Sequence, residues 1–68
     1  MRIAVVGCGS IGKRHLSNLQ ALGVQELVAV DIREDRLLEV RDRVGAEVTC
    51  FNNVNEALAN RCHGVIVG

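Results

Sequence analysis

Short apolar runs alternate along this chain with stretches in which apolar residues recur every three or four positions. The apolar runs cover residues 2–6 and 26–31, a short segment around Val48, Cys50 and Phe51, and residues 64–67. Runs of this length that are rich in Val and Ile are typical of buried β-strands. Helical spacing between the runs predicts α-helices over residues 10–22 and 34–43, and a shorter one over residues 56–59.

Two of the predicted helices carry an apolar stripe that would face a sheet. The stripe of the first helix consists of Ile11, Leu16, Leu19 and Leu22. The stripe of the second consists of Leu37, Leu38, Val40 and Val44, and the charged residues between them are expected to face water. Gly23 and Gly45 are expected to end these helices, and Asn53 or Asn55 to cap the third.

The first apolar run leads into a glycine-rich turn. Gly7, Gly9 and Gly12 have the spacing G-x-G-x-x-G, and Asp31 ends the second apolar run about 20 residues later. In such a turn the first glycine reverses the chain and the second lets backbone approach a pyrophosphate. The third allows the following helix to pack on the strand, and the helix N-terminus attracts the anion. The sequence therefore predicts a dinucleotide site.

The alternation of strand and helix predicts an α/β fold. We expect a Rossmann-type half domain whose parallel sheet has about four strands in the order 3-2-1-4, with helices on both faces. Right-handed crossovers place the first two helices on one face and the third on the other. The cofactor crevice should then open between the first and fourth strands.

Ten residues form the candidate cofactor site. They are Gly7, Cys8, Gly9, Ser10, Ile11, Gly12, Asp31, Ile32, Arg33 and Arg36. A carboxylate at Asp31 would accept hydrogen bonds from both ribose hydroxyls of NAD and repel the 2′-phosphate of NADP, so NAD is favoured. NADP stays open as an alternative because Arg33 and Arg36 could accept that phosphate, although each could also be a solvated charge at a helix start.

Composition excludes several other classes of function. The formal net charge of this 68-residue chain is zero, with no basic excess to bind nucleic acid, and no apolar stretch reaches the length of a membrane span. We expect a cytoplasmic protein. The three cysteines are odd in number and widely spaced, which favours reduced thiols over disulfides, and no second His, Asp or Cys joins His63 at metal-ligand spacing. No metal site is proposed.

The carboxyl end predicts that the domain continues. The run Val65-Ile66-Val67 is typical of a strand buried on both faces, yet one short helix cannot cover the second face. We therefore expect residues 1–68 to be the amino-terminal part of a dinucleotide-binding domain, with the substrate domain absent. Open strand edges and an uncovered apolar face also predict a homo-oligomer.

The residues around the turn resemble one family closely. The run is Gly7-Cys8-Gly9-Ser10-Ile11-Gly12-Lys13-Arg14-His15-Leu16-Ser17-Asn18-Leu19, followed by Leu27-Val28-Ala29-Val30-Asp31 and Arg36. It resembles the amino-terminal domain of the glucose-fructose oxidoreductase and inositol 2-dehydrogenase family. The resemblance implies an NAD- or NADP-dependent enzyme that oxidises or reduces a sugar, a cyclitol or a related hydroxyl or carbonyl compound.

The same resemblance implies that catalysis needs more than this chain. The catalytic lysine of that family lies in a Glu-Lys-Pro motif beyond the fourth strand, and this chain contains no proline. No residue here is therefore assigned a catalytic role, and a small-molecule substrate would bind only with the missing domain.

A second class of function stays open, that of a regulatory module which binds NAD or ATP without performing chemistry. Domains of potassium-transport regulators resemble this fold and also end the second strand on an acid. Their typical Gly-Asp after the third strand is replaced here by Phe51-Asn52-Asn53, which disfavours this alternative. Ligand choice separates the two classes, since the regulator accepts adenine nucleotides without nicotinamide.

Overall fold

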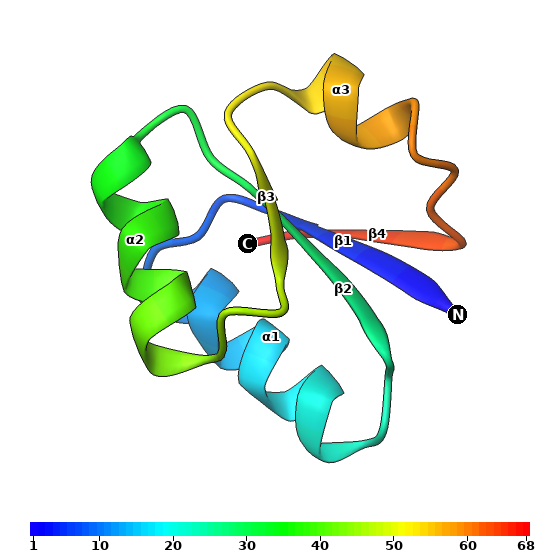
Figure 1. Cartoon of the computed structure of the whole chain (residues 1–68), viewed down its shortest axis with the longest axis horizontal. Helices are drawn as coiled ribbons and strands as arrows, with labels where there is room; N and C mark the ends of the chain where they lie inside the picture. Colours follow the sequence, from blue (N-terminus) through cyan, green and yellow to red (C-terminus); the bar gives the residue numbers. More distant parts are fainter.

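Strands and helices alternate through the whole chain, as the sequence predicts (Figure 1). The computed structural model describes all residues, 1–68. Its elements are β1 (Arg2–Val6), α1 (Ser10–Ala21), β2 (Glu26–Val30), α2 (Glu34–Arg43), β3 (Thr49–Phe51), α3 (Val54–Leu58) and β4 (Gly64–Val67). Asn53 caps α3 by accepting a hydrogen bond from the Glu56 amide.

The four strands form one parallel sheet in the order β3-β2-β1-β4, which confirms the predicted topology. In the centre of the sheet β1 pairs with β2 from Arg2 opposite Glu26 to Val6 opposite Val30. The carboxyl ends of these two strands therefore lie at the same edge. That edge carries the glycine turn after β1 and Asp31 after β2.

The helices divide between the two faces of the sheet. Buried residues of α1 and α2, such as Leu16 and Val40, pack with Val5 and Ala29 in one apolar cluster. A second, smaller cluster joins Ala57 of α3 to residues of β1 and β2. Figure 1 shows α1 and α2 on one side of the strands and α3 on the other, as predicted.

The predicted apolar stripes are partly wrong. Ile11 and Leu22 of the first stripe and Leu38 of the second are exposed. In α1 the face against the sheet contains Gly12 and Leu16. Gly12 has no side chain, so the helix approaches the sheet closely on that face. Ile11, the next residue around the helix, therefore points outward. In α2 Leu37 and Val40 are buried, whereas Leu38 lies on the face of the helix that is exposed to solvent.

Apolar side chains of β4 are left exposed on the sheet face that one short helix is expected not to cover. Val65 is 48% exposed and Val67 79% exposed, because the cluster under α3 on that side of the sheet joins residues of β1, β2 and β3 and includes neither valine. The predicted homo-oligomer stays a prediction. No helix is both long enough and apolar enough to cross a membrane.

Candidate functional site

The chain turns sharply between β1 and α1 at the first glycine of the motif. Gly7 has a φ angle of +89°, a conformation that side chains other than that of glycine rarely adopt. Its amide donates a hydrogen bond of 2.8 Å to the carbonyl oxygen of Val30 at the end of β2. The turn is thus held against the neighbouring strand, and Gly7 has the role that the sequence predicts for it.

Gly12 packs against the turn itself. A Cβ atom at this position would lie 1.8 Å from the carbonyl oxygen of Gly7, a distance that no side chain permits, and 3.6 Å from a methyl carbon of Val5. The absence of a side chain lets the first turn of α1 close onto both the glycine turn and β1. The third glycine therefore sets the position of the helix N-terminus.

The second glycine leaves an open approach to free backbone donors. A Cβ at Gly9 would meet only the Arg36 guanidinium, at 3.8 Å or more. The amides of Gly9, Ser10 and Ile11 donate no hydrogen bond within the chain. Unpaired donors at the positive end of a helix dipole suit an anion. These observations fit the pyrophosphate of a dinucleotide.

Cys8 supports the turn from within the core. Its thiol is fully buried and lies 3.6 Å from the carbonyl oxygen of Val30. Burial is the main cause that raises the pKa of this thiol to about 11, so it stays protonated at neutral pH. Its amide donates a 2.8 Å hydrogen bond to Asp31 Oδ2. The Cys8 side chain thus points away from the open side of the turn.

Asp31 joins the end of β2 to the glycine turn. Its side chain is only 5% exposed, and Oδ1 accepts a second hydrogen bond, of 2.9 Å, from the Arg33 amide. Burial raises the pKa of the carboxyl group most strongly. The hydrogen bonds from Arg33 and Cys8 and the charge of Arg36 together outweigh it and hold the pKa below its usual value. Asp31 is therefore an ionised acceptor at neutral pH.

The structure separates the two candidate arginines. Arg33 forms an ion pair of 2.8 Å with Asp35, and its side chain is 57% exposed. Arg36 reaches back from α2, with Nη1 3.6 Å from Asp31 Oδ2. Because the Arg36 guanidinium also borders the space before Gly9, only Arg36 is brought to the glycine turn. Arg33 contributes its amide, through the bond to Asp31.

A groove of about 220 Å³ opens beside Asp31 at the carboxyl ends of the strands. Ile32, which is largely exposed, forms one wall. The full lining is Val6, Gly7, Val30, Asp31, Ile32, Arg36, Asn52, Asn53 and Val54. The sequence interpretation did not include Val6, Val30 or the three residues after β3 in the site. Asn52, Asn53 and Val54 follow the third strand, whose carboxyl end lies at the same edge of the sheet, and this position could have indicated them.

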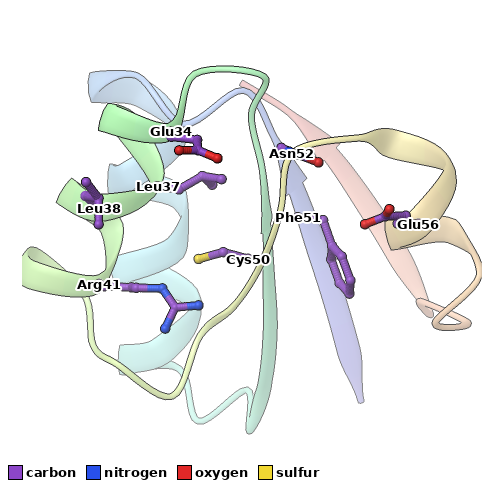
Figure 2. A pocket seen from close by; sticks show the side chains of 8 residues that line it. All are labelled: Glu34, Leu37, Leu38, Arg41, Cys50, Phe51, Asn52 and Glu56. Atoms are coloured by element: carbon purple, nitrogen blue, oxygen red, sulfur yellow. The ribbon is translucent and has the colours of Figure 1, made fainter.

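A larger cavity of about 350 Å³ lies at the free edge of β3, away from the glycine turn (Figure 2). Figure 2 shows Leu37, Leu38 and Arg41 of α2 on one side of β3 and Glu56 of α3 on the other. Its lining thus wraps around an edge strand and includes none of the ten candidate residues. The smaller groove, which contains Gly7 and Asp31, is the better candidate despite its size.

Lys13 is a contact of the turn that the sequence interpretation did not place in the site. Its Nζ atom donates a hydrogen bond of 3.2 Å to the carbonyl oxygen of Cys8. The side chain is only 14% exposed and also lies 3.6 Å from Glu39 Oε2 of α2. The signal in the sequence was a lysine one position after the last glycine of the motif.

The two histidines lie apart from the turn's hydrogen-bond network. His63 Nδ1 accepts a hydrogen bond of 2.9 Å from the Arg2 amide at the opposite end of β1, and His15 lies in the second turn of α1. No group of three or more His, Cys, Asp or Glu side chains is arranged to hold a metal ion. All three cysteines are free thiols.

The parallel sheet, the glycine turn and the acid at the end of β2 together define a dinucleotide-binding domain. Comparison with known families matches residues 1–68 to the family described as "Oxidoreductase family, NAD-binding Rossmann fold". The chain belongs to this family. The resemblance drawn from the sequence is thereby confirmed, and the regulatory alternative is not favoured.

Two curated proteins are similar to the chain. A myo-inositol 2-dehydrogenase of Thermotoga maritima is 46% identical over 48 residues, which are 69% of this chain and 14% of that protein. The myo-inositol dehydrogenase Hyg17 of Streptomyces leeuwenhoekii is 37% identical over 67 residues, which are 98% of this chain and 20% of that protein. The chain thus spans a fifth or less of the length of these relatives.

Proposed function

We propose that the chain binds NAD through its glycine turn as the NAD(P)-binding portion of an oxidoreductase. One observation carries the proposal. The free amides of Gly9, Ser10 and Ile11 face an open approach, and the ionised Asp31 lies beside them at the end of β2. Donors for a pyrophosphate and an acceptor for ribose hydroxyls are thus offered at one edge of the sheet.

Each part of the dinucleotide has candidate residues. The amides after Gly7 would hold the pyrophosphate, and the carboxylate of Asp31 would accept from the ribose hydroxyls. The groove bordered by Ile32 would receive the adenosine. Arg36, which already pairs with Asp31, is the residue available to a 2′-phosphate, so NADP stays a second choice. When bound, the nicotinamide ring accepts or donates a hydride.

The substrate class follows from the relatives. Both similar proteins are named as inositol dehydrogenases, and inositol is a cyclitol. We extend this to a whole protein that transfers hydride between the nicotinamide and a sugar, a cyclitol or a related hydroxyl or carbonyl substrate. Residues 1–68 would supply cofactor binding, and the reacting groups would come from another domain.

A titration with NADH tests the binding function. The chain contains neither Trp nor Tyr, so NADH emission can be followed against little protein background. We expect saturable binding that NAD displaces, and an affinity for NADH about tenfold or more above that for ATP, or 1.4 kcal/mol. Binding of ATP as tightly as NADH would instead support a regulatory nucleotide module. Absence of NADH binding by the folded chain would contradict both.

A further inference from the structure

We propose that Lys13 is a positioning residue that orients the Cys8–Gly9 peptide toward the pyrophosphate of the cofactor. The inference rests on the proposed function and assigns a role to a side chain outside the glycine motif. Lys13 lies on the first turn of α1, and its amine donates a hydrogen bond to the carbonyl oxygen of Cys8.

The surroundings of Lys13 hold its amine in place. Only 14% of the side chain is exposed, and Nζ lies between the Cys8 carbonyl oxygen at 3.2 Å and Glu39 Oε2 at 3.6 Å. A lysine amine has three donors and no acceptor, so it binds a carbonyl and a carboxylate at the same time. Lys13 therefore ties the glycine turn to α2 as well as to α1.

The bond to Cys8 fixes where the next amide points. All peptide bonds of the chain are trans, so the Cys8 carbonyl and the Gly9 amide point in opposite directions from one peptide plane. The carbonyl is held on the Lys13 side. The Gly9 amide, which has no partner within the chain, is consequently directed away from Lys13.

The preceding peptide unit is held by a charge of the opposite sign. The Cys8 amide donates to Asp31 Oδ2 at 2.8 Å, while the Cys8 carbonyl accepts from Lys13. Cys8 is thus clamped on both sides by charge-assisted hydrogen bonds, which are stronger than neutral ones. Without Lys13, the Cys8 carbonyl loses its donor. Because the next residue is the flexible Gly9, the peptide could then rotate and turn this carbonyl oxygen toward the anion, which it would repel.

Replacement of Lys13 by Met tests this role, because Met keeps the buried stem and removes the donor. We expect NADH affinity to fall about tenfold, as for loss of one charge-assisted contact. Affinity for adenosine, which lacks the pyrophosphate, should stay unchanged. The Gly9 amide resonance of the free protein should shift in ¹⁵N-correlated spectra. Lys13→Arg should restore most of the affinity.

Two matched variants isolate the contact. Arg14→Met removes one positive charge from an exposed position on the same helix, and Glu39→Gln removes the ion pair but leaves the Cys8 bond. Arg14→Met should bind NADH within about twofold of the wild type. Glu39→Gln removes one of the two groups that hold the Lys13 amine, so it should lose affinity, but less than Lys13→Met. If Lys13→Met does not fold, Lys13→Gln, which keeps a neutral donor, should show a smaller loss confined to NADH.

The outcomes separate this inference from the proposed function. Wild-type NADH affinity in Lys13→Met, or equal losses for NADH and adenosine, would overturn the positioning role while leaving NAD binding intact. A wild-type chain that is folded and does not bind NADH would overturn the proposed function and this inference with it. A loss confined to NADH, with a shifted Gly9 amide, supports the inference.

Discussion

Replacing Gly12 with Ala is expected to destabilise the domain more than any other single methyl group added to a glycine. The new Cβ would lie 1.8 Å from the Gly7 carbonyl oxygen, so either the glycine turn or α1 must move. Overpacking that flexible side chains can absorb costs about 1–3 kcal/mol, and here backbone is the obstacle. We expect the free energy of unfolding to fall by about 3 kcal/mol or more, measured by urea denaturation followed by circular dichroism.

Gly64→Ala is the matched control for this substitution. No heavy atom lies within 4 Å of a Cβ built at Gly64, which begins β4. Its stability should stay within about 0.5 kcal/mol of the wild type. Equal stability of the Gly12 and Gly64 variants would show that α1 does not pack on the turn as described.

Asp31→Ala is expected to weaken NADH binding by about 10- to 100-fold, the loss typical of charge-assisted hydrogen bonds. NADPH binding should weaken less. Both cofactors lose the brace that Asp31 gives to the Cys8 amide, but NADH loses an acceptor for two ribose hydroxyls, whereas NADPH, which carries a phosphate on one of them, loses an acceptor for one. NADPH also gains, because removal of the carboxylate relieves repulsion of the 2′-phosphate and frees Arg36. Titration of the variant with each cofactor measures the difference.

Asp35→Ala provides the control, since Asp35 lies four residues further on and binds Arg33 in an exposed ion pair. It removes the same charge at a distance from the turn. Both cofactors should bind this variant nearly as well as the wild type. Equal losses for NADH and NADPH in Asp31→Ala would contradict the proposed contact with ribose.

The elements and their order were predictable because two independent sequence signals indicate them. Apolar runs of strand length are separated by helical spacing, and Gly23 and Gly45 follow the last turns of α1 and α2. The rotation of each helix was not predictable from the same pattern. Ile11 fits the helical spacing but is exposed, because the close approach of Gly12 decides which face of α1 meets the sheet.

The part of the site that belongs to one short sequence motif was predictable. The glycine spacing places Gly7, Gly9 and Gly12 in one turn, and parallel pairing of β1 with β2 brings Asp31 beside them. Contacts between separate elements have no such signature. Arg33 and Arg36 look alike in the sequence, yet only Arg36 lies on the part of α2 that reaches Asp31.

Lys13 and the loop after β3 were missed for the same reason. The bond from Lys13 to Cys8 depends on how α1 leaves the turn, and the lining by Asn52 and Asn53 depends on the alignment of strand ends. The glycine spacing itself includes neither Lys13 nor the asparagines, so the motif does not predict their contacts. Their positions become apparent only when the sheet and helices are assembled.

The residues that contact NADH can be mapped on the backbone amides of the chain. In a titration followed by ¹⁵N-correlated spectra, we expect saturable shifts that are largest at Gly9, Ser10 and Ile11, with smaller ones beside Asp31. These amides are the unpaired donors at the start of α1. Largest shifts around Arg41 and Phe51 at the free edge of β3, or no saturable shifts in a folded chain, would contradict binding at the glycine turn.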